Sequence, residues 1–319
     1  AAFSIKQYEK ELLDTMNTNR HSITYFPFPL SPGTAEQAAG CEAVLVFTND
    51  DVSAPVIALL ADLGIKYIAT RSVGTDHIDK EEASKRGIRI ANVPAYSPEA
   101  IAEHAVMLAL ALARKLIPTV DQSRRYDFTI ENHMGFNLHK KTVGIVGLGH
   151  IGKATARIFK GFGCRVIGFD VCFPEDALGV EEKNFDQLLE ESDIISLHVP
   201  LTPKSRHMIN EPCIAKMKAG VMIINTARGA LVDTEAAIPA LENKKIGAFG
   251  LDVYEYEKGL FFADHQSDVN KDPLLAKLLD FENVIVTPHQ AFLTKEAVTE
   301  IAASTLSNLN KWKAEGDDE

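Results

Sequence analysis

Three ionisable residues in the second half of the chain each follow a short apolar segment. Arg228 comes after VMIINTA, Glu257 after GLDVYEY and His289 after NVIVTP. An arginine fork binds a carboxylate through two parallel hydrogen bonds. An imidazole gives or takes a proton near neutral pH, and a neighbouring carboxylate favours its charged form and fixes its tautomer. Together the three suit hydride transfer to a keto acid, although each alone could be a capping, loop or surface residue.

A glycine-rich loop lies upstream of these residues, in TVGIVGLGHIG. Gly147, Gly149 and Gly152 form GxGxxG between an apolar segment and a helical pattern, which is the context of a dinucleotide-binding loop. Gly147 would permit a tight turn, Gly149 the approach of backbone amides to a pyrophosphate, and Gly152 close helix–strand packing. Asp170, 18 residues after Gly152, is either a solvated strand end or the acceptor for ribose hydroxyls. A carboxylate there would repel a 2′-phosphate, which favours NAD over NADP.

The elements that must position these residues alternate between apolar segments and helical patterns. In the first third of the chain, strands are predicted at 43–47, 66–69 and 88–91, and helices at 52–63 and 79–86. Gly64 and Gly87 follow these two helices as C′ glycines. Ser97 and Pro98 suit the start of a long, nearly all-apolar helix, so we place the first domain boundary there.

After this helix the alternation predicts a second parallel sheet. Strands are predicted at 142–146, 165–169, 193–198, 221–225, 248–253 and 283–287, and helices at 151–162, 184–191, 210–217, 233–242 and 273–279. Six strands with helical crossovers match a doubly wound dinucleotide-binding sheet, in which ligands bind outside the carboxyl ends of the strands. We therefore expect Arg228, Glu257 and His289 at one edge. A last helix at 295–313 could return to the first domain.

Composition excludes several other classes of protein. The 319 residues include 33 Lys and Arg against 44 Asp and Glu, a net charge of −11 that disfavours nucleic acid as a partner. The four cysteines form no CxxC pair, and no metal-ligand spacing appears, so no metal is expected. The start AAFSIKQYEKELL shows no signal peptide, and the most apolar stretch, 101–116, contains Glu103, His104 and Arg114. We expect no membrane span and a cytoplasmic location.

Several longer segments resemble those of one enzyme family. VGIVGLGHIGKATARIFKGFGCRVIGFD, SLHVPLTPKSRHMIN, MIINTARGALVDTEA, GLDVYEYE and TPHQAFLT are similar to segments of the D-isomer-specific 2-hydroxyacid dehydrogenases. RSVGTDHID, NVPAYSPEAIAEHAV and EYEKGLFFADHQSD are most like the fermentative D-lactate dehydrogenases. The resemblance implies an α/β fold of two doubly wound parallel-sheet domains. A Rossmann coenzyme domain that binds NAD would span 97–292, and a smaller, flavodoxin-like substrate domain 1–96 and 293–319.

The resemblance also implies a role for individual residues. Arg228 would bind the substrate carboxylate, and Glu257 would pair with His289, the catalytic acid and base. Contacts to NAD would come from Gly147, Gly149, His150, Ile151, Gly152, Asp170, Val199, Pro200, Ser205, Thr226, Ala227, Arg228 and Asp252. Contacts to the substrate would come from Val73, Gly74, Tyr96, Arg228, His289 and Phe292.

The implied reaction is the reversible reduction of pyruvate to D-lactate by NADH, and the family forms homodimers or homotetramers. Two alternatives stay open. One is a dehydrogenase for a bulkier 2-keto acid, and the other is an NAD-binding protein similar to transcriptional corepressors that keep this fold. The short acidic tail AEGDDE favours the metabolic enzyme.

Overall fold

The chain folds into two compact units. The computed structural model describes residues 1–18 and 21–316. Unit 1 comprises Ala1–Ser97 with Leu293–Glu319, and unit 2 comprises Pro98–Phe292. The first of these limits lies one residue from the domain boundary that the sequence predicts, and the second coincides with it. The assignment of a substrate-binding role to unit 1 stays a prediction.

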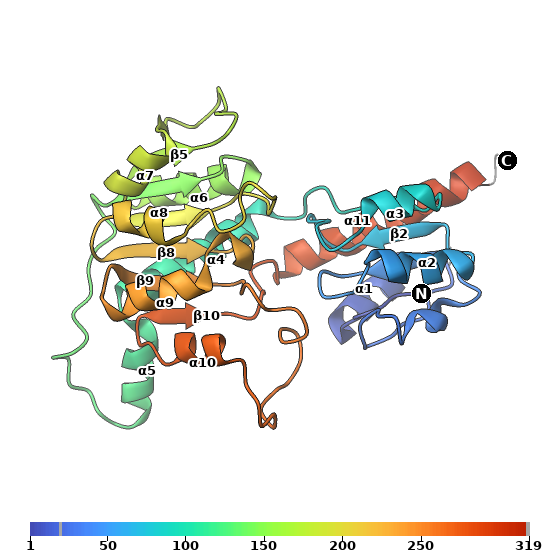
Figure 1. Cartoon of the computed structure of the whole chain (residues 1–319), viewed down its shortest axis with the longest axis horizontal. Coiled ribbons are helices and arrows are strands. Elements are labelled where there is room, and N and C mark those ends of the chain that lie inside the picture. Colours follow the sequence, from blue (N-terminus) through green and yellow to red (C-terminus); the bar gives the residue numbers. More distant parts are fainter. Residues whose placement is uncertain (19–20, 317–319) are drawn as a thin grey trace. The chain divides into compact units, whose positions relative to one another are not determined.

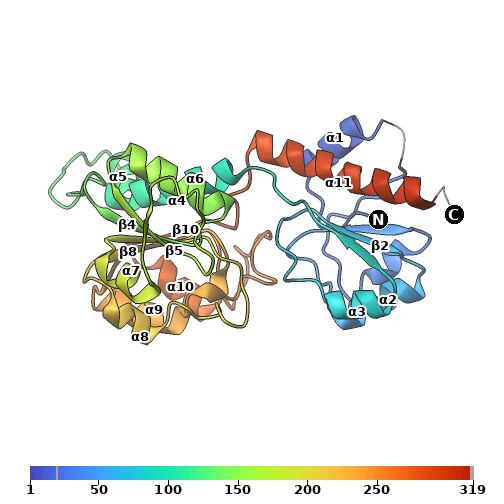
Figure 2. The same cartoon turned by 90° about the horizontal axis from the view of Figure 1, so that it is seen from above.

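Unit 1 is a three-layer α/β structure around a small parallel sheet. Its strands are β1 (Ala43–Val46), β2 (Tyr67–Thr70) and β3 (Arg89–Ala91), in the order β1-β2-β3. Helices α1 (Gln7–Met16) and α11 (Lys295–Gly316) cover one face, and α2 (Ala54–Asp62) and α3 (Lys80–Lys85) cover the other (Figure 2). A short 3-10 helix, Ala35–Ala38, packs near α2. The sequence predicts this sheet, but it does not reveal α1, in which Leu13 is the one residue that is buried.

Two glycine turns and two sets of buried side chains fix the helices of unit 1 on its sheet. The backbone angle φ is +84° at Gly64 and +71° at Gly87, so the glycines after α2 and α3 adopt the left-handed conformation that the sequence predicts. On one face of the sheet, Ile57 and Leu60 of α2 are fully buried. On the other face, Trp312 of α11 stacks on Tyr67 with ring centroids 4.7 Å apart. The last helix of the chain is therefore part of this unit.

Unit 2 is a doubly wound parallel sheet (Figure 1). Its strands are β4 (Thr142–Val146), β5 (Arg165–Phe169), β6 (Glu181–Glu182), β7 (Ile194–Leu197), β8 (Val221–Asn225), β9 (Ile246–Leu251) and β10 (Val284–Val286). The order is β10-β9-β8-β7-β4-β5-β6, so the chain changes direction between β4 and β7. The prediction of six strands misses β6, because two exposed glutamates paired with β5 carry no strand pattern.

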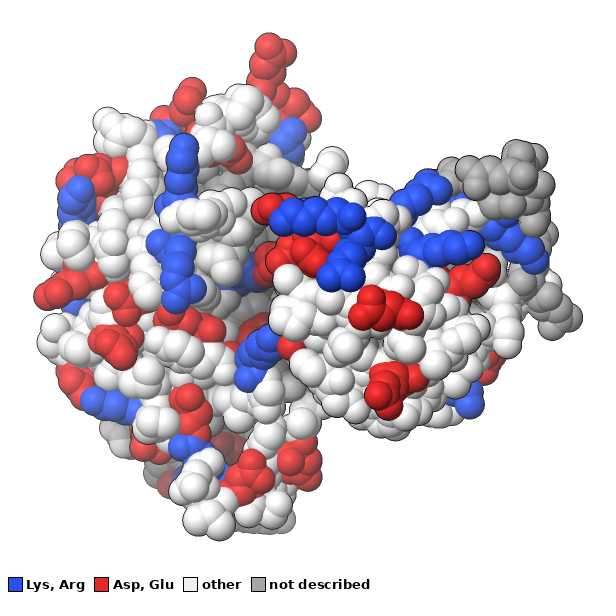
Figure 3. Space-filling model, turned by 45° about the vertical axis from the view of Figure 1, so that its right-hand side comes forward, with Lys and Arg blue, Asp and Glu red and all other residues white. Residues whose placement is uncertain are grey.

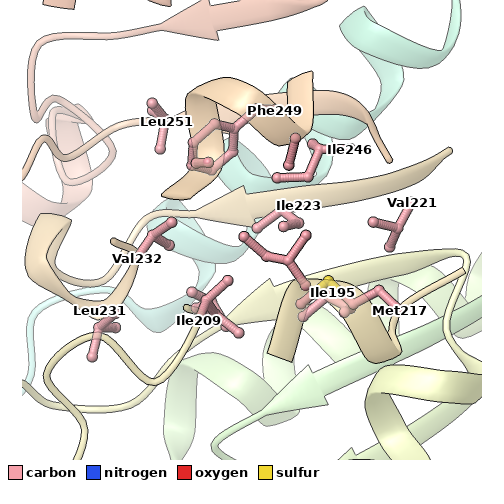
Figure 4. Packing of buried hydrophobic residues seen from close by; sticks show 14 of the residues in the cluster. Ile195, Ile209, Met217, Val221, Ile223, Leu231, Val232, Ile246, Phe249 and Leu251 are labelled. Carbon is pink, nitrogen blue, oxygen red and sulfur yellow. The ribbon is translucent and has the colours of Figure 1, made fainter. Parts of the chain in front are cut away.

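Helices cover both faces of this sheet. On one face lie α4 (Pro98–Ala113) and α6 (His150–Gly161), with α5 (Leu116–Arg124) continuing from α4. The other face carries α7 (Phe185–Glu191), α8 (Glu211–Lys216), α9 (Thr234–Glu242) and α10 (Pro273–Leu279), as Figure 2 shows. A 3-10 turn, Gly229–Leu231, follows β8. Figure 4 shows part of the core beneath the second group, where Ile195, Ile223 and Phe249 come from three neighbouring strands.

Polar residues begin the helices on that second face. Asn184, Asn210, Asp233 and Asp272 each accept a hydrogen bond from a backbone N–H in the first turn of α7, α8, α9 and α10. A side-chain acceptor at this position satisfies an amide that has no partner within the helix. For α7, α8 and α9, the sequence predicts a start one residue earlier, at the capping residue itself.

The surface carries both signs of charge. On the face seen in Figure 3, acidic and basic side chains are intermixed, and the basic ones form no continuous stripe. The expectation that nucleic acid is not a partner stays a prediction. Among the residues that the structure describes, no helix is both long and apolar enough to cross a membrane.

Candidate active site

The three ionisable residues follow three neighbouring strands of unit 2. Arg228 follows β8, Glu257 follows β9 and His289 follows β10, and these strands are adjacent in the order β10-β9-β8. Since all three strands are parallel, their carboxyl ends lie at the same edge of the sheet. The structure thus brings the loops of these residues to one edge, as the sequence predicts.

The side chains of His289 and Glu257 are joined by a hydrogen bond. Nδ1 of the imidazole lies 2.8 Å from Oε1 of the carboxylate, and the two side chains are 16% and 25% exposed. Because an ionised carboxylate only accepts, Nδ1 carries the hydrogen and Nε2 remains for chemistry. The second carboxylate oxygen accepts from the backbone N–H of Tyr254 at 2.9 Å, which holds Glu257 in place.

The backbone of His289 adopts an unusual conformation, with φ at +52°. Its N–H donates to the carbonyl of Asp252 at 2.7 Å and to that of Thr287 at 2.9 Å. The fully buried carboxylate of Asp252 accepts from the N–H groups of Gln290 (2.9 Å) and Ala291 (2.8 Å) and from the hydroxyl of Thr287 (2.6 Å). Asp252 therefore holds the loop that presents the imidazole, a structural function that the sequence does not reveal.

His104 on α4 completes this network. Its Nε2 lies 2.9 Å from the hydroxyl oxygen of Thr287 and 3.4 Å from Oδ1 of Asp252. These contacts satisfy the imidazole within the fold, as expected of a structural residue rather than a catalyst. The contact of Asp252 with the nicotinamide stays a prediction, since the partners described above belong to the protein.

The loop of Arg228 is fixed by close backbone packing. A Cβ on Gly229 would stand 2.1 Å from the carbonyl carbon of Tyr254, so only glycine fits between the loops after β8 and β9. The side chain of Asn225 donates to the carbonyl of Arg228 at 2.8 Å, and the guanidinium donates to the carbonyl of Ala227 at 2.7 Å. The arginine is half-buried at the edge that carries Glu257 and His289.

The glycine loop has the geometry that its three predicted roles require. Gly147 has φ at +92°, and a Cβ there would lie 2.6 Å from the carbonyl oxygen of His198. On Gly152 a Cβ would lie 1.9 Å from the carbonyl oxygen of Gly147, so the helix packs directly on the turn. On Gly149, by contrast, a Cβ would meet nothing within 4 Å. The loop is therefore open on the side where a ligand would approach its amides.

The neighbours of this loop also fit a dinucleotide. His150 and Ile151 begin α6, where the first N–H groups have no helical acceptor and attract anions. Asp170 accepts from the N–H of Leu148 at 2.7 Å and from that of Cys172 at 3.0 Å, one bond to each oxygen. Each oxygen retains a lone pair that a ribose hydroxyl can use.

The remaining cofactor candidates follow β7 and β8. The buried hydroxyl of Thr226 has no hydrogen-bond partner within residues 1–18 and 21–316, as expected of a group that faces a ligand. Ser205, in contrast, donates to the carbonyl of Pro200 at 2.7 Å and accepts from Thr202 N–H at 2.8 Å, so its hydroxyl is already used within its own loop. Val199 is half-buried and packs against the core, and Ala227 lies next to Arg228.

The substrate candidates are divided between the two units. Val73, Gly74 and Tyr96 belong to unit 1, and Phe292 is the last residue of unit 2. The loop after β2 is tied by side chains: Ser72 donates to the carbonyl of Gly74 at 2.7 Å, and Asn92 to that of Val73 at 2.8 Å. Their contacts with a substrate stay predictions.

A second carboxylate two residues before Glu257 has a different role. Glu255 is 2% exposed, and its Oε1 lies 2.5 Å from Nε2 of His207 and 3.2 Å from the guanidinium of Arg206. It also accepts from the N–H of Thr234 at 3.3 Å. This buried carboxylate joins three loops of the edge. The spacing alone does not say which glutamate of YEYE pairs with His289.

Two further groups have displaced pKa values. Burial lowers the pKa of His198 to about 3, and its Nε2 lies 2.9 Å from the hydroxyl oxygen of Ser196, so the ring stays neutral. Burial, followed by the hydrogen bond to Asp272, raises the pKa of Tyr254. The Tyr254 hydroxyl donates to that carboxylate at 2.7 Å, which links the segment of Glu257 to the start of α10. In the described part of the chain, no three His, Cys, Asp or Glu side chains form a metal-binding group.

Comparison with known proteins agrees with this geometry. Residues 106–291 match the NAD binding domain of D-isomer specific 2-hydroxyacid dehydrogenases. D-lactate dehydrogenase of Escherichia coli is 46% identical, over 97% of this chain and 95% of its own.

Two solved structures are also similar. The pyruvate reductase of Chlamydomonas reinhardtii is 42% identical, with a TM-score of 0.90 over 98% of this chain and 95% of its own. The D-lactate dehydrogenase of Aquifex aeolicus in complex with NAD and lactic acid is 34% identical, with a TM-score of 0.88 over 99% of this chain and 95% of its own. The chain therefore belongs to the D-isomer specific 2-hydroxyacid dehydrogenase family, as its sequence motifs predict.

Proposed function

We propose that the chain catalyses the reversible, NAD-dependent reduction of pyruvate to D-lactate, with His289 as the general acid and base. The observation that carries the proposal is the hydrogen bond of 2.8 Å between His289 and Glu257, at the sheet edge that also carries Arg228. The similarity to relatives that are D-lactate dehydrogenases supports the choice of substrate.

The residues of unit 2 would divide the work as follows. Arg228 binds the carboxylate of the keto acid through its guanidinium fork. Nε2 of His289 holds the proton that passes to the carbonyl oxygen, while Nδ1 keeps its bond to Glu257. The carboxylate of Glu257 stabilises the charged imidazole before transfer. When bound, NADH supplies the hydride that reaches the carbonyl carbon.

Other residues of the chain would hold the substrate and the cofactor. The N–H groups of the Val73–Gly74 loop would bind the substrate carboxylate, and Tyr96 and Phe292 would surround its short side chain. The open side of Gly149 and the N-terminus of α6 would hold the pyrophosphate, and Asp170 the adenosine ribose. The unpartnered hydroxyl of Thr226 would contact the nicotinamide side.

Replacement of the imidazole tests the proposal. For His289→Ala, we expect kcat for pyruvate reduction to fall about 10²- to 10⁴-fold with little change in NADH affinity. A matched control is His265→Ala, because His265 pairs with Asp268 on an exposed segment after Glu257, 2.7 Å away. Wild-type turnover by the His289 variant would contradict its assignment as acid and base.

The two alternatives make different predictions in the same assays. A dehydrogenase for a bulkier acid would keep the pair of His289 and Glu257 but reduce 2-ketoisocaproate faster than pyruvate. A corepressor-like protein would bind NADH tightly and retain a short peptide in a pull-down. The relatives described above favour pyruvate over both.

We also propose a homo-oligomer that forms through unit 2, with a second copy of this chain covering the projecting arm. The arm consists of α5 and residues 125–138, and Figure 1 shows that it extends away from the sheet. Three of its large apolar side chains, those of Tyr126, Ile130 and Met134, are 88%, 79% and 84% exposed. Light scattering should show a dimer or tetramer, and Ile130→Lys should weaken it. A monomeric wild-type protein would refute this part.

We propose a cytoplasmic location for the enzyme. The four cysteines, at positions 41, 164, 172 and 213, are free thiols. Unpaired cysteines in a chain of this size are typical of a reducing compartment. Pyruvate-dependent NADH oxidation should appear in the cytosolic fraction of the source cells, and its recovery outside them would contradict this location.

A further inference from the structure

An aromatic side chain lies against the imidazole that the proposed reaction uses. The ring of Phe262 is 5.8 Å from that of His289, centroid to centroid, with 37° between the two planes. Within the described residues this is the one aromatic contact of His289 that the structure defines, and it belongs to the segment that follows Glu257. The roles inferred from the sequence do not include Phe262.

The backbone of Phe262 is held in a conformation that phenylalanine avoids. Its φ is +68°, and the φ of His289 is +52°, so two residues in the left-handed region face each other. A bulky side chain at positive φ is rare and persists only where the surrounding contacts require it. Such positions are concentrated at active sites.

Hydrogen bonds hold the segment that leads to Phe262. The N–H groups of Leu260 and Phe261 both donate to the carbonyl of Glu257, at 2.9 Å each, and close a turn. The carboxylate of Glu257 is fixed in turn by Tyr254 N–H and by His289. The residue that leaves this turn is Phe262. One segment thus delivers both the carboxylate and the aromatic ring to the imidazole.

The two contacts act on different properties of the imidazole. The carboxylate binds Nδ1 and so fixes the tautomer and one direction in the ring plane. An aromatic ring at this distance limits tilting about that bond. It also attracts a cation through its quadrupole, within the usual distance of about 6 Å.

We propose that Phe262 is a positioning residue for proton transfer: its ring orients the His289 imidazole and stabilises the protonated form. The inference rests on the proposed function of His289. Other charged or titratable groups around that side chain are Glu257, which binds it, Asp252 and His104 behind its loop, and Arg228 after β8. None of these changes when Phe262 is replaced.

The chain offers a matched pair of variants. Phe262→Leu removes the aromatic face but keeps an apolar side chain and the same positive φ. The control is Phe261→Leu, because Phe261 stacks on Tyr254 (ring centroids 6.4 Å apart) and packs against the core of unit 2. If Phe262 had only a structural role, Phe262→Leu would lower the melting temperature and keep the wild-type pH profile, as expected for Phe261→Leu. Phe262→Tyr restores the ring and should rescue activity.

The expected result is a displaced pH profile. For Phe262→Leu, the pH at which kcat/KM for pyruvate falls to half should move about half a unit lower, with about threefold less activity above it. Its melting temperature should stay near that of the wild type. Phe261→Leu should melt at a lower temperature and keep the wild-type pH profile.

A readout that is independent of turnover separates the inference from the proposed function. In the NMR spectrum of the protein without ligands, the imidazole signal that disappears in His289→Asn should titrate about half a unit lower in Phe262→Leu. An unchanged titration and pH profile in Phe262→Leu would overturn the inference. So would a Phe262→Tyr variant whose titration and pH profile are displaced like those of Phe262→Leu. Absence of pyruvate turnover by the wild type would instead overturn the proposed function, while the NMR titration still tests the contact.

Discussion

Two glycines of the same loop are expected to respond in opposite ways to an added methyl group. On Gly152, a Cβ would stand 1.9 Å from the carbonyl oxygen of Gly147 and 3.3 Å from the side chain of Ile145. On Gly149 it would meet nothing within 4 Å. The backbone of Gly149, with φ at −68°, is one that alanine adopts readily. Gly152→Ala should therefore damage the fold, and Gly149→Ala should damage ligand binding.

The sizes of the two effects follow from these contacts. Insertion of a methyl group against a fixed carbonyl costs about 1–3 kcal/mol, which lowers the melting temperature by about 3–10 °C for a unit of this size. Gly149→Ala should leave the melting temperature unchanged or raise it slightly, because alanine restricts the unfolded chain. It should raise the Kd for NADH about 10- to 150-fold, if hydrogen bonds worth about 1.5–3 kcal/mol to the pyrophosphate are lost.

The assay is thermal unfolding of both variants without cofactor, followed by NADH fluorescence titration. The combination expected is a stable Gly149→Ala that binds NADH weakly and a Gly152→Ala that unfolds early. Wild-type NADH affinity in Gly149→Ala would refute the location of the pyrophosphate. Wild-type stability in Gly152→Ala would refute the close packing of α6 on the loop.

Three further changes test neighbouring parts of the account. Glu257→Gln keeps the bond to Nδ1 but loses the charge, so kcat for pyruvate reduction should fall about 5- to 30-fold and the pH profile should move to lower pH; an unchanged profile would contradict the role of the carboxylate. Asp170→Ala should weaken NADH binding about tenfold or more and improve the relative use of NADPH, and steady-state kinetics with both cofactors would reveal either outcome. His198→Gln should remove a pH dependence of stability: the pKa of this histidine is about 3 when folded, against about 6.5 when unfolded. The wild type therefore loses stability as pH falls below about 6.5, by at most about 2 kcal/mol at pH 5, since part of the residue is exposed. Urea unfolding of both proteins at pH 7.5 and 5 measures how much unfolding free energy each loses between the two pH values. An equal loss in the wild type and in His198→Gln would contradict the burial of the ring.

Much of the fold is visible in the sequence because its strands are short apolar runs. The strands 142–146, 165–169 and 221–225 are predicted at the limits that the structure shows. Others, such as the one expected at 193–198, extend one residue too far at each end. The elements that escape prediction carry little pattern: β6 is two exposed glutamates, and α5 has no buried residue. Pairing with β5 defines β6, and continuity with α4 defines α5.

The site is predictable only in part, because spacing shows which loops meet and not which side chains touch. The positions of Arg228, Glu257 and His289 follow from the edge rule for parallel strands. The burial of Asp252 against the loop of His289 does not, and neither does the choice between Glu255 and Glu257. The positive φ of His289 and Phe262 has no signal in the sequence, since neither residue is a glycine. These features depend on hydrogen bonds between distant segments.

The most direct test of the proposed function is the loss of NADH absorbance with pyruvate, beside glyoxylate, hydroxypyruvate and 2-ketoisocaproate, with the chirality of the product determined. The account predicts fast oxidation with pyruvate, D-lactate as the product, and turnover about 10²- to 10⁴-fold slower in His289→Ala. Faster turnover of the branched acid would contradict the assigned substrate. Tight NADH binding without turnover of any of the four acids would contradict the assignment of a dehydrogenase activity.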